Sequence, residues 1–472
     1  MWFFKKRRQL SALSMLGLDD LMALCSHLFL IGGSGSGKTS ALKIIMAEIL
    51  DRGVGCVWGC VKSDEAENAI SVINSTSMRD WLLHLVPGQF CFNFLSYELN
   101  VREGGTADSA ARLLKRLNDQ MMRTSGKQSE SFWENLFYQY LHFSIVICHF
   151  AFREQITIEH VSKLINSTPS SLEKAKSPEF KSSDCFKLLE LAQKRIANDS
   201  DRRLYQMAVD FLLEGQMELG SKARSAAVSQ CNALLSPFLL SPMYETVCGE
   251  STFTPDMPLE GYCVVLDAPV LKYQQAGILF QSLISLMVIE EALRRPHPER
   301  ITAIVRDEYQ MLISDPEFEA MALSVGRSHG LAFIAATQNI PLLHSAMGGD
   351  SAGEQQMLAL LANHNTQLVL ANRCSVTNSH FSEAFGSHRE QFISVNESEP
   401  EEAGDLYSLV FGSDNYRFST SEQLVPRLTP DDFLSLRRGG KSHRFLVDAF
   451  LTQGGRTFND GCPFKLVTFS QR

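Results

Sequence analysis

The sequence predicts an α/β protein whose mostly parallel sheet is interrupted by a block of helices. Three observations support this fold class. Short apolar runs alternate with helical patterns near the start of the chain and again in its second half, which is typical of a parallel sheet covered by helices. Between these two regions, residues 106–212 show helical patterns and almost no strand signal. A glycine-rich turn joins the first predicted strand directly to the first predicted helix.

The first region begins with a strand, a helix and a second strand. Residues 27–31 form a short apolar run, and residues 38–50 place their apolar side chains on one side of a helix. Gly53 supplies a helix stop, and residues 54–58 form the next apolar run. This order is the start of a parallel α/β sheet.

The helical block is best explained as an all-helical subdomain inserted into the α/β domain. It contains the predicted helices 107–122, 131–152, 158–165 and 185–197, with a polar loop at 166–184. The chain therefore divides into residues 1–105, which begin the α/β domain, the insert at 106–212, and residues 213–472, which complete that domain.

The longest uncharged stretch lies inside this block, between Glu134 and Arg153, and it is long enough to cross a membrane. Four polar side chains interrupt it: Asn135, Gln139, His142 and His149. Because such groups are rare in lipid, we expect a buried core helix. The N-terminus also lacks a signal-peptide pattern, so we expect no integral membrane segment and a cytoplasmic protein, or one peripheral at the inner face of the membrane.

The second half returns to strands, predicted at 262–266, 301–305, 331–335 and 366–371, with a long helix at 273–294. Ser314-Asp315-Pro316-Glu317 reads as a capping box that opens another helix, with Phe318, Met321, Ala322 and Val325 on one face. The acidic segment 396–404 is predicted to be an exposed loop.

Composition sets limits on function. The chain has 472 residues, 44% of them hydrophobic and 21% charged, which predicts a sizeable core and two or three domains. The formal net charge of −9 excludes a bulk polycation that coats nucleic acid, although a local basic surface remains compatible with it. The 11 cysteines include no CxxC pair, which favours reduced thiols over zinc ligation or a disulfide framework.

The glycine-rich turn is the most informative motif. Gly32-Gly33-Ser34-Gly35-Ser36-Gly37-Lys38-Thr39 matches G-x-x-x-x-G-K-[ST] between a predicted strand and a predicted helix. Its glycines let backbone N–H groups point at phosphate oxygens. Lys38 would reach the β- and γ-phosphates, the Thr39 hydroxyl would bind Mg²⁺, and Ser40 completes the predicted nucleotide-binding segment. The motif therefore predicts ATP and Mg²⁺ binding.

An acidic partner for the magnesium has two candidates. Residues 262–266 end at Asp267, and residues 301–305 are followed by Arg306 and then by Asp307 and Glu308. The pair is favoured because Asp307 can hold Mg²⁺ through water while Glu308 polarises the attacking water. Asp267 remains the alternative, since Arg306 occupies a position that is normally apolar.

Two further polar residues flank the strand at 331–335. Gln338 follows this strand at the edge where α/β sheets bind ligands, so it either senses the γ-phosphate or satisfies loop backbone groups. Arg327 precedes the strand at a helix end. It either acts as an arginine finger across a subunit boundary or is a solvated arginine favoured by the helix dipole.

These segments together resemble the conjugative coupling proteins, the TraD/TraG-like ATPases that deliver DNA to type IV secretion channels. The resemblance rests on Asp307-Glu308-Tyr309-Gln310, Gly326-Arg327-Ser328, Ala336-Thr337-Gln338-Asn339 and the segment Asn372 to Gly386. It also rests on the order of an early phosphate loop, a helical insert beginning near Phe132-Trp133, and the remainder. Family members usually carry N-terminal membrane helices, and this sequence shows none.

The resemblance implies a RecA-like P-loop NTPase that assembles as a homo-hexamer and threads DNA through its pore as it hydrolyses ATP. It implies catalytic roles for Asp307 and Glu308, a trans finger at Arg327 and a phosphate sensor at Gln338. It further implies that the helical insert faces the relaxase or secretion-channel proteins. An ATPase that moves protein, or a nucleotide-dependent switch with little turnover, are the alternatives.

Overall fold

The computed structural model describes residues 11–124, 131–216, 220–296, 298–397, 416–458 and 461–472. The chain forms two compact units. The first comprises Met1–Ile31 and Lys38–Gln367, and the second comprises Gly32–Gly37 and Leu368–Arg472. The glycine-rich segment is thus grouped with the second unit, while the helix that follows it belongs to the first.

The first unit is built on a parallel sheet. Among its described residues the strand order is β1-β6-β5-β2-β4-β3, and every neighbouring pair is parallel. The strands are β1 (Leu28–Ile31), β2 (Gly55–Cys60), β3 (Leu82–Leu85), β4 (Cys263–Asp267), β5 (Thr302–Arg306) and β6 (Leu331–Thr337). Strands β1, β2, β5 and β6 are buried along their whole length, as expected for a sheet covered on both faces. Their carboxyl ends lie along one edge, and β6 separates β1 from β5.

The helices that accompany this sheet begin at well-defined side-chain caps. Asp315 accepts hydrogen bonds from the backbone N–H groups at the start of one helix, and Asn339 and Asp350 do the same for the next two. The elements are α1 (Ala12–Leu16), α2 (Leu21–Leu24), α3 (Lys38–Leu50), α4 (Glu65–Asn74), η1 (Arg79–Trp81), α15 (Met257–Glu260), α16 (Val270–Arg294), α17 (Tyr309–Leu312), α18 (Pro316–Val325), η6 (Gly326–His329), α19 (Ile340–Ala346) and α20 (Ser351–Asn363).

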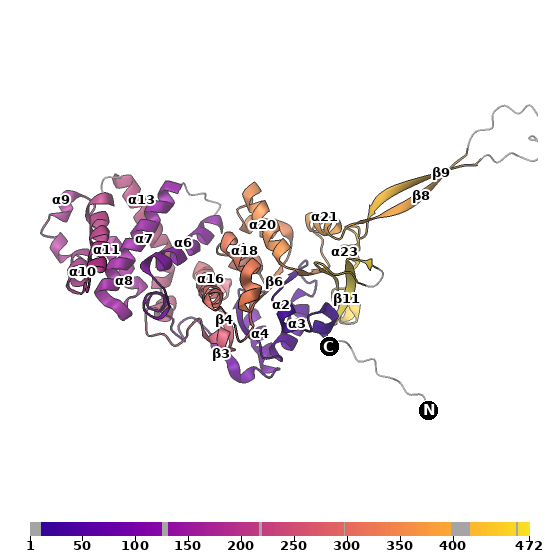
Figure 1. Cartoon of the computed structure of the whole chain (residues 1–472), viewed down its shortest axis with the longest axis horizontal. Helices are drawn as coiled ribbons and strands as arrows, with labels where there is room; N and C mark the ends of the chain where they lie inside the picture. Colours follow the sequence, from indigo (N-terminus) through magenta and orange to yellow (C-terminus); the bar gives the residue numbers. More distant parts are fainter. Residues whose placement is uncertain (1–10, 125–130, 217–219, 297, 398–415, 459–460) are drawn as a thin grey trace, which may run out of the picture. The chain divides into compact units, whose positions relative to one another are not determined.

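Between β3 and β4 the described elements are all helical. They are α5 (Phe94–Ser96), η2 (Tyr97–Val101), α6 (Ala107–Thr124), α7 (Ser131–Phe152), η3 (Arg153–Gln155), α8 (Ile158–Ser167), α9 (Leu172–Ala175), η4 (Phe180–Ser182), α10 (Asp184–Lys194), α11 (Asp199–Asp210), η5 (Phe211–Gly215), α13 (Ser221–Leu239) and α14 (Met243–Val247), followed by α15. Helix α7 packs against α6, α8, α10, α11 and α13, which gather around it in Figure 1. Helix α6 also contacts α16, beside the sheet.

The second unit contains a small aromatic core and a long hairpin. Its strands are β7 (Thr366–Leu370, from Leu368 onward), β10 (Leu446–Gln453) and β11 (Phe464–Ser470), and β10 and β11 are antiparallel. The hairpin pairs β8 (Ser387–Glu397) with β9 (Tyr416–Pro426), and α21 (Ser375–Ala384), α23 (Asp432–Ser435) and η7 (Lys441–His443) complete the unit. The core is an aromatic cluster of Phe381, Phe385, Phe433, Phe450 and Phe464.

The predicted α/β fold class is confirmed, and several predicted details need correction. The loop predicted at 166–184 contains α9 and η4, and the helix predicted to reach residue 197 ends at Lys194. Residues 396 and 397 belong to β8, whereas the rest of the predicted acidic loop lies outside the described residues. Strands β3, β8, β9, β10 and β11 were not predicted.

The start of α18 also differs from the prediction. Asp315, not Ser314, is the N-cap, because Pro316 occupies the first helical turn and the residue before a proline is held out of the helix. Met321 and Val325 are 44% and 38% exposed, so the buried face of this helix is narrower than predicted.

Among the described helices, α16 alone is long and apolar enough to cross a membrane by length and composition, and 72% of its apolar window is buried inside the protein. The uncharged stretch that was considered from the sequence lies in α7 and packs within the helical region.

Candidate nucleotide site

The phosphate loop leaves β1 and is tightly wound. Gly35 and Gly37 have φ angles of 69° and 94°, a conformation that side chains disfavour. A Cβ atom at Gly37 would lie 2.5 Å from Cγ2 of Val447. The backbone N–H of Gly33 donates to the carbonyl of Ala371 at 2.9 Å, and the hydroxyl of Ser36 is buried without a hydrogen-bond partner among the described residues. A buried unpaired hydroxyl in a glycine loop fits a segment that binds a polar ligand.

Lys38 and Thr39 open α3 in the first unit. Lys38 is only 8% exposed. Burial lowers the pKa of its ammonium group, while Asp307 and Glu308 act in the opposite direction. The hydroxyl of Thr39 donates a hydrogen bond of 2.9 Å to Oδ2 of Asp307. Two distant parts of the sequence therefore meet at this edge of the sheet.

The two candidate magnesium partners have different surroundings. Asp307 follows β5, is 2% exposed, and keeps its Oδ1 buried without a hydrogen-bond partner among the described residues. Burial raises the pKa of its carboxyl group. Asp267 ends β4, one fourth of its side chain is exposed, and it accepts a hydrogen bond of 2.9 Å from Nε2 of His84. Only Asp307 of these two contacts Thr39.

A hydroxyl oxygen beside a carboxylate with an unused buried oxygen fits Mg²⁺, which prefers oxygen ligands. Thr39 and Asp307 would hold the ion, directly or through water. Mg²⁺ bound there supplies positive charge that offsets the charge on phosphate oxygens.

Glu308 lies beside Asp307 in a network that the sequence predicted only in part. Its Oε1 forms an ion pair with Lys62 and accepts a hydrogen bond of 3.3 Å from Gln338. Its Oε2 accepts one of 2.6 Å from Gln310, whose own Oε1 accepts a hydrogen bond from Thr337. Burial alone would raise the pKa of Glu308, but Lys62 and Gln310 outweigh it and the pKa is lowered. Glu308 is therefore held as a carboxylate.

Lys62 was missed by the sequence reasoning. It follows β2 and is held by Glu65, whose Oε2 accepts the backbone N–H groups of Val61 and Lys62 at 2.7 and 3.1 Å. The ammonium group of Lys62 lies 3.3 Å from the other oxygen of Glu65. Burial and the nearby Asp307 raise the pKa of Glu65 to about 7. The sheet-edge rule that drew attention to Gln338 also applies to the residues after β2, and it would have found Lys62.

Arg306, the unusual residue before the acidic pair, has a buried carboxylate as its partner. Its guanidinium group forms an ion pair with Glu319 of α18, and the two residues are 2% and 0% exposed. Arg306 also lies beside the ring of Tyr309, with its Cζ 5.9 Å from the ring centroid. A buried ion pair thus fastens the end of β5 to α18.

Gln338 and Arg327 lie at opposite ends of β6. Gln338 follows the strand and contacts Glu308, whereas Arg327 is exposed in η6, which precedes the strand. Strand β6 has seven residues, so at roughly 3.3 Å per residue its ends lie about 20 Å apart. The structure therefore brings together Lys38, Thr39, Asp307, Glu308 and Gln338, and it does not bring Arg327 to this set within one chain.

Helix α6 forms hydrogen bonds and an ion pair with the segment that follows the acidic pair. Gln120 donates to the carbonyl of Met311 at 3.1 Å, and Arg123 donates to that of Ser314. One turn earlier, Nε of Arg116 lies 3.1 Å from Asp315. Because these side chains recur on one face of α6, a movement of this helix would reach the segment after Glu308.

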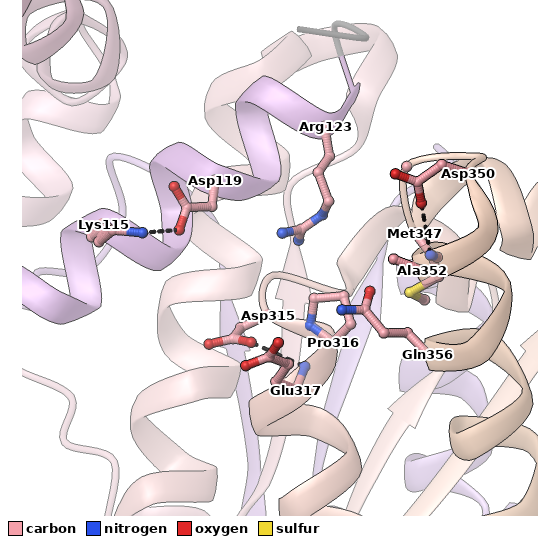
Figure 2. A pocket seen from close by; sticks show the side chains of 12 residues that line it. Lys115, Asp119, Arg123, Asp315, Pro316, Glu317, Met347, Asp350, Ala352 and Gln356 are labelled. Atoms are coloured by element: carbon pink, nitrogen blue, oxygen red, sulfur yellow. Dashed lines mark hydrogen bonds and ion pairs between the residues drawn. The ribbon is translucent and has the colours of Figure 1, made fainter. Parts of the chain in front are cut away.

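A cavity of about 560 Å³ lies beside this contact, between α6 and the beginnings of α18 and α20. Figure 2 shows Arg123 pointing from α6 into this space, above Pro316. Four carboxylates and two cations line it: Asp119, Asp315, Glu317 and Asp350 with Lys115 and Arg123. The excess of acidic groups makes this cavity unsuitable for a triphosphate.

Comparisons with known proteins identify one matching family model and several solved structures of similar fold. Residues 302–438 match the family model described as the TraM recognition site of TraD and TraG. No curated protein matches the chain. The solved structure of the bacterial conjugative coupling protein TrwBdeltaN70 in its unbound form has a TM-score of 0.59 at 17% identity, covering 95% of this chain and 86% of that one. TrwB with an ATP analogue, ADPNP, and TrwB with ADP and Mg²⁺ give TM-scores of 0.57 and 0.56 at 16% and 15% identity, with the same coverage.

The fold is accordingly the α/β, RecA-like fold of these solved structures, built on a mostly parallel sheet. Over residues 302–438 the chain is similar to the recognition-site region of the TraD and TraG coupling proteins.

Proposed function

We propose that this protein is an ATP-driven motor of the type IV secretion coupling class, which hydrolyses ATP to move DNA or nucleoprotein toward a transfer channel. One observation carries the proposal: the Thr39 hydroxyl meets Asp307 at 2.9 Å, with Glu308 next in the chain. A phosphate loop and an acidic pair that follow strands of one parallel sheet are the parts that ATP hydrolysis needs.

Each residue has a distinct role in this proposal. Gly32–Thr39 and Ser40 bind the nucleotide, with Lys38 directed at the terminal phosphates. Thr39 and Asp307 hold Mg²⁺. Glu308 polarises the attacking water, and Gln338, which reports through its contact with Glu308, senses the γ-phosphate. The structures of TrwB with ADP and Mg²⁺ and with ADPNP support nucleotide binding at a site of this kind.

The helical region is proposed as the inserted domain, beginning near residue 106 and extending beyond the predicted limit at residue 212 to include α13, which packs on α7 and α8. We assign it contacts with the relaxase or channel proteins. The hydrogen bonds from α6 to the carbonyls of Met311 and Ser314 give a physical route by which partner binding to these helices alters the position of the catalytic segment. The match to a TraM recognition site supports a protein partner for residues 302–438. A homo-hexameric ring with DNA in its pore completes the proposal.

The deciding experiment is the ATPase rate of the purified chain with and without DNA at low salt. We expect single- or double-stranded DNA to raise the rate at least about fivefold, because DNA bound through its phosphates would stabilise the assembled ring. The Lys38→Ala variant should show no ATP hydrolysis, either with or without DNA. If neither form of DNA changes the wild-type rate, a motor that moves protein becomes the better interpretation. If the wild type shows no ATP turnover under any condition, a nucleotide-dependent binding switch becomes the better interpretation.

Arg327 is proposed to act in the site of a neighbouring subunit, since about 20 Å of strand separates it from its own Glu308. Arg327→Ala should lower turnover at least about tenfold in the assembled protein, with little change in ATP affinity. Mixing it with Glu308→Gln should restore part of the activity, because some interfaces then combine an intact Glu308 with an intact Arg327. No recovery in the mixture, or the same loss in a proven monomer, would contradict the trans role.

A further inference from the structure

Lys62 occupies an unusual position among the site's carboxylates. Its ammonium group forms ion pairs with Glu308 and Glu65, and Asp307 and Lys38 are both close enough to influence it electrostatically. The side chain of Lys62 is 46% exposed, whereas those of Glu308 and Glu65 are only 3% and 5% exposed. The cation is therefore the member of this cluster with room to move.

The ion pair works against the proposed role of Glu308. A carboxylate that polarises water needs a lone pair directed at that water, and Lys62 and Gln338 both occupy Oε1. A neighbouring ammonium group also makes a carboxylate a weaker base, and Lys62 is ion-paired with Glu308. Gln310 would still orient Glu308 through Oε2 if Lys62 left.

We propose that Lys62 is a second phosphate-directed lysine, which restrains Glu308 by an ion pair and transfers to the terminal phosphate when a nucleoside triphosphate binds. The inference rests on the proposed function and adds a residue to it. A terminal phosphate carries more negative charge than one carboxylate, and it would lie near Lys38, which Lys62 already influences. Lysine suits such a transfer because its four-carbon stem is flexible. A diphosphate lacks the γ-phosphate that Lys62 is proposed to reach, so Glu308 stays restrained.

The test compares ATP and ADP affinities by calorimetry for the wild type, Lys62→Met and Lys62→Arg. We expect Lys62→Met to weaken ATP binding about tenfold, the value of one charge-assisted hydrogen bond, and to leave ADP binding within about twofold. Lys62→Arg should recover part of the preference for ATP. Lys43→Met, which removes a lysine from the body of α3, is the matched control and should leave the ratio of the two affinities unchanged.

A double-mutant cycle separates transfer from a static structural role. Glu308→Gln should tighten ATP binding about threefold or more, because Lys62 no longer has to leave a carboxylate, and this gain should vanish in the Lys62→Met background. If Lys62→Met weakened ATP binding and ADP binding equally, the proposal would be overturned. Strictly additive effects of the Lys62 and Glu308 substitutions on ATP affinity would overturn it too. A wild type that binds ATP no better than Lys38→Ala would instead overturn the proposed function.

Discussion

Glu308→Gln is expected to keep ATP binding and to lose at least about hundredfold in turnover. Glutamine has nearly the same shape as glutamate but cannot accept the proton of the attacking water. The partners of Glu308 are hydrogen-bond donors, Gln310 at 2.6 Å and Gln338 at 3.3 Å, so an amide oxygen can still accept from one of them. The loop is therefore expected to keep its place.

Steady-state ATPase rates together with thermal melts in the presence of ATP would check this result. Ligand that binds the folded state raises the melting temperature, so a retained ATP-dependent shift would show that binding survives. Asp267→Asn is the matched control: it also removes one carboxylate charge at the end of a strand, but at a position paired with His84 and away from Thr39. Turnover that persists in Glu308→Gln and falls in Asp267→Asn would reverse the assignment of the acidic residues.

Much of the site could be predicted because its strongest signals are local in the chain. The phosphate loop is one contiguous segment with glycines where φ is positive, and α3 has the same bounds as predicted. The pairing of Thr39 with Asp307 needed only the rule that parallel strands end at a common edge. The motif does not give the strand order, in which β6 lies between β1 and β5 and places Gln338 beside Glu308.

The features that the sequence did not explain have two physical causes: a partner that lies elsewhere in the sequence, and a strand that lacks an apolar face. The sheet-edge rule could have drawn attention to Lys62, but its ion pair with Glu308 follows only from the strand order that puts β2 next to β5. The hairpin of β8 and β9 was missed because the described side chains from residue 387 to 394 are exposed along the strand, so no alternation of apolar and polar residues marks it. Arg306 looked out of place until Glu319, thirteen positions later in a helix, supplied its counter-charge.

Breaking the ion pair between Arg306 and Glu319 is expected to have the largest effect on stability. Arg306→Met should lower the free energy of unfolding by about 3–5 kcal/mol, because it leaves Glu319 as a buried carboxylate without a cation. Glu319 is 0% exposed, and burial already raises the pKa of its carboxyl group even with Arg306 in place. Urea unfolding of the single variant and the wild type would measure the difference.

The double variant Arg306→Met with Glu319→Leu should recover most of this loss, because an apolar pair of similar volume avoids burying charge. A single variant as stable as the wild type would show that the ion pair contributes nothing. The double variant then separates two roles of Arg306, which directly precedes Asp307 and joins the end of β5 to α18. If stability returns and ATPase activity does not, the ion pair serves to position Asp307 opposite Thr39. If both return, the pair is a feature of the core, and the geometry of the acidic residues is set by the strand itself.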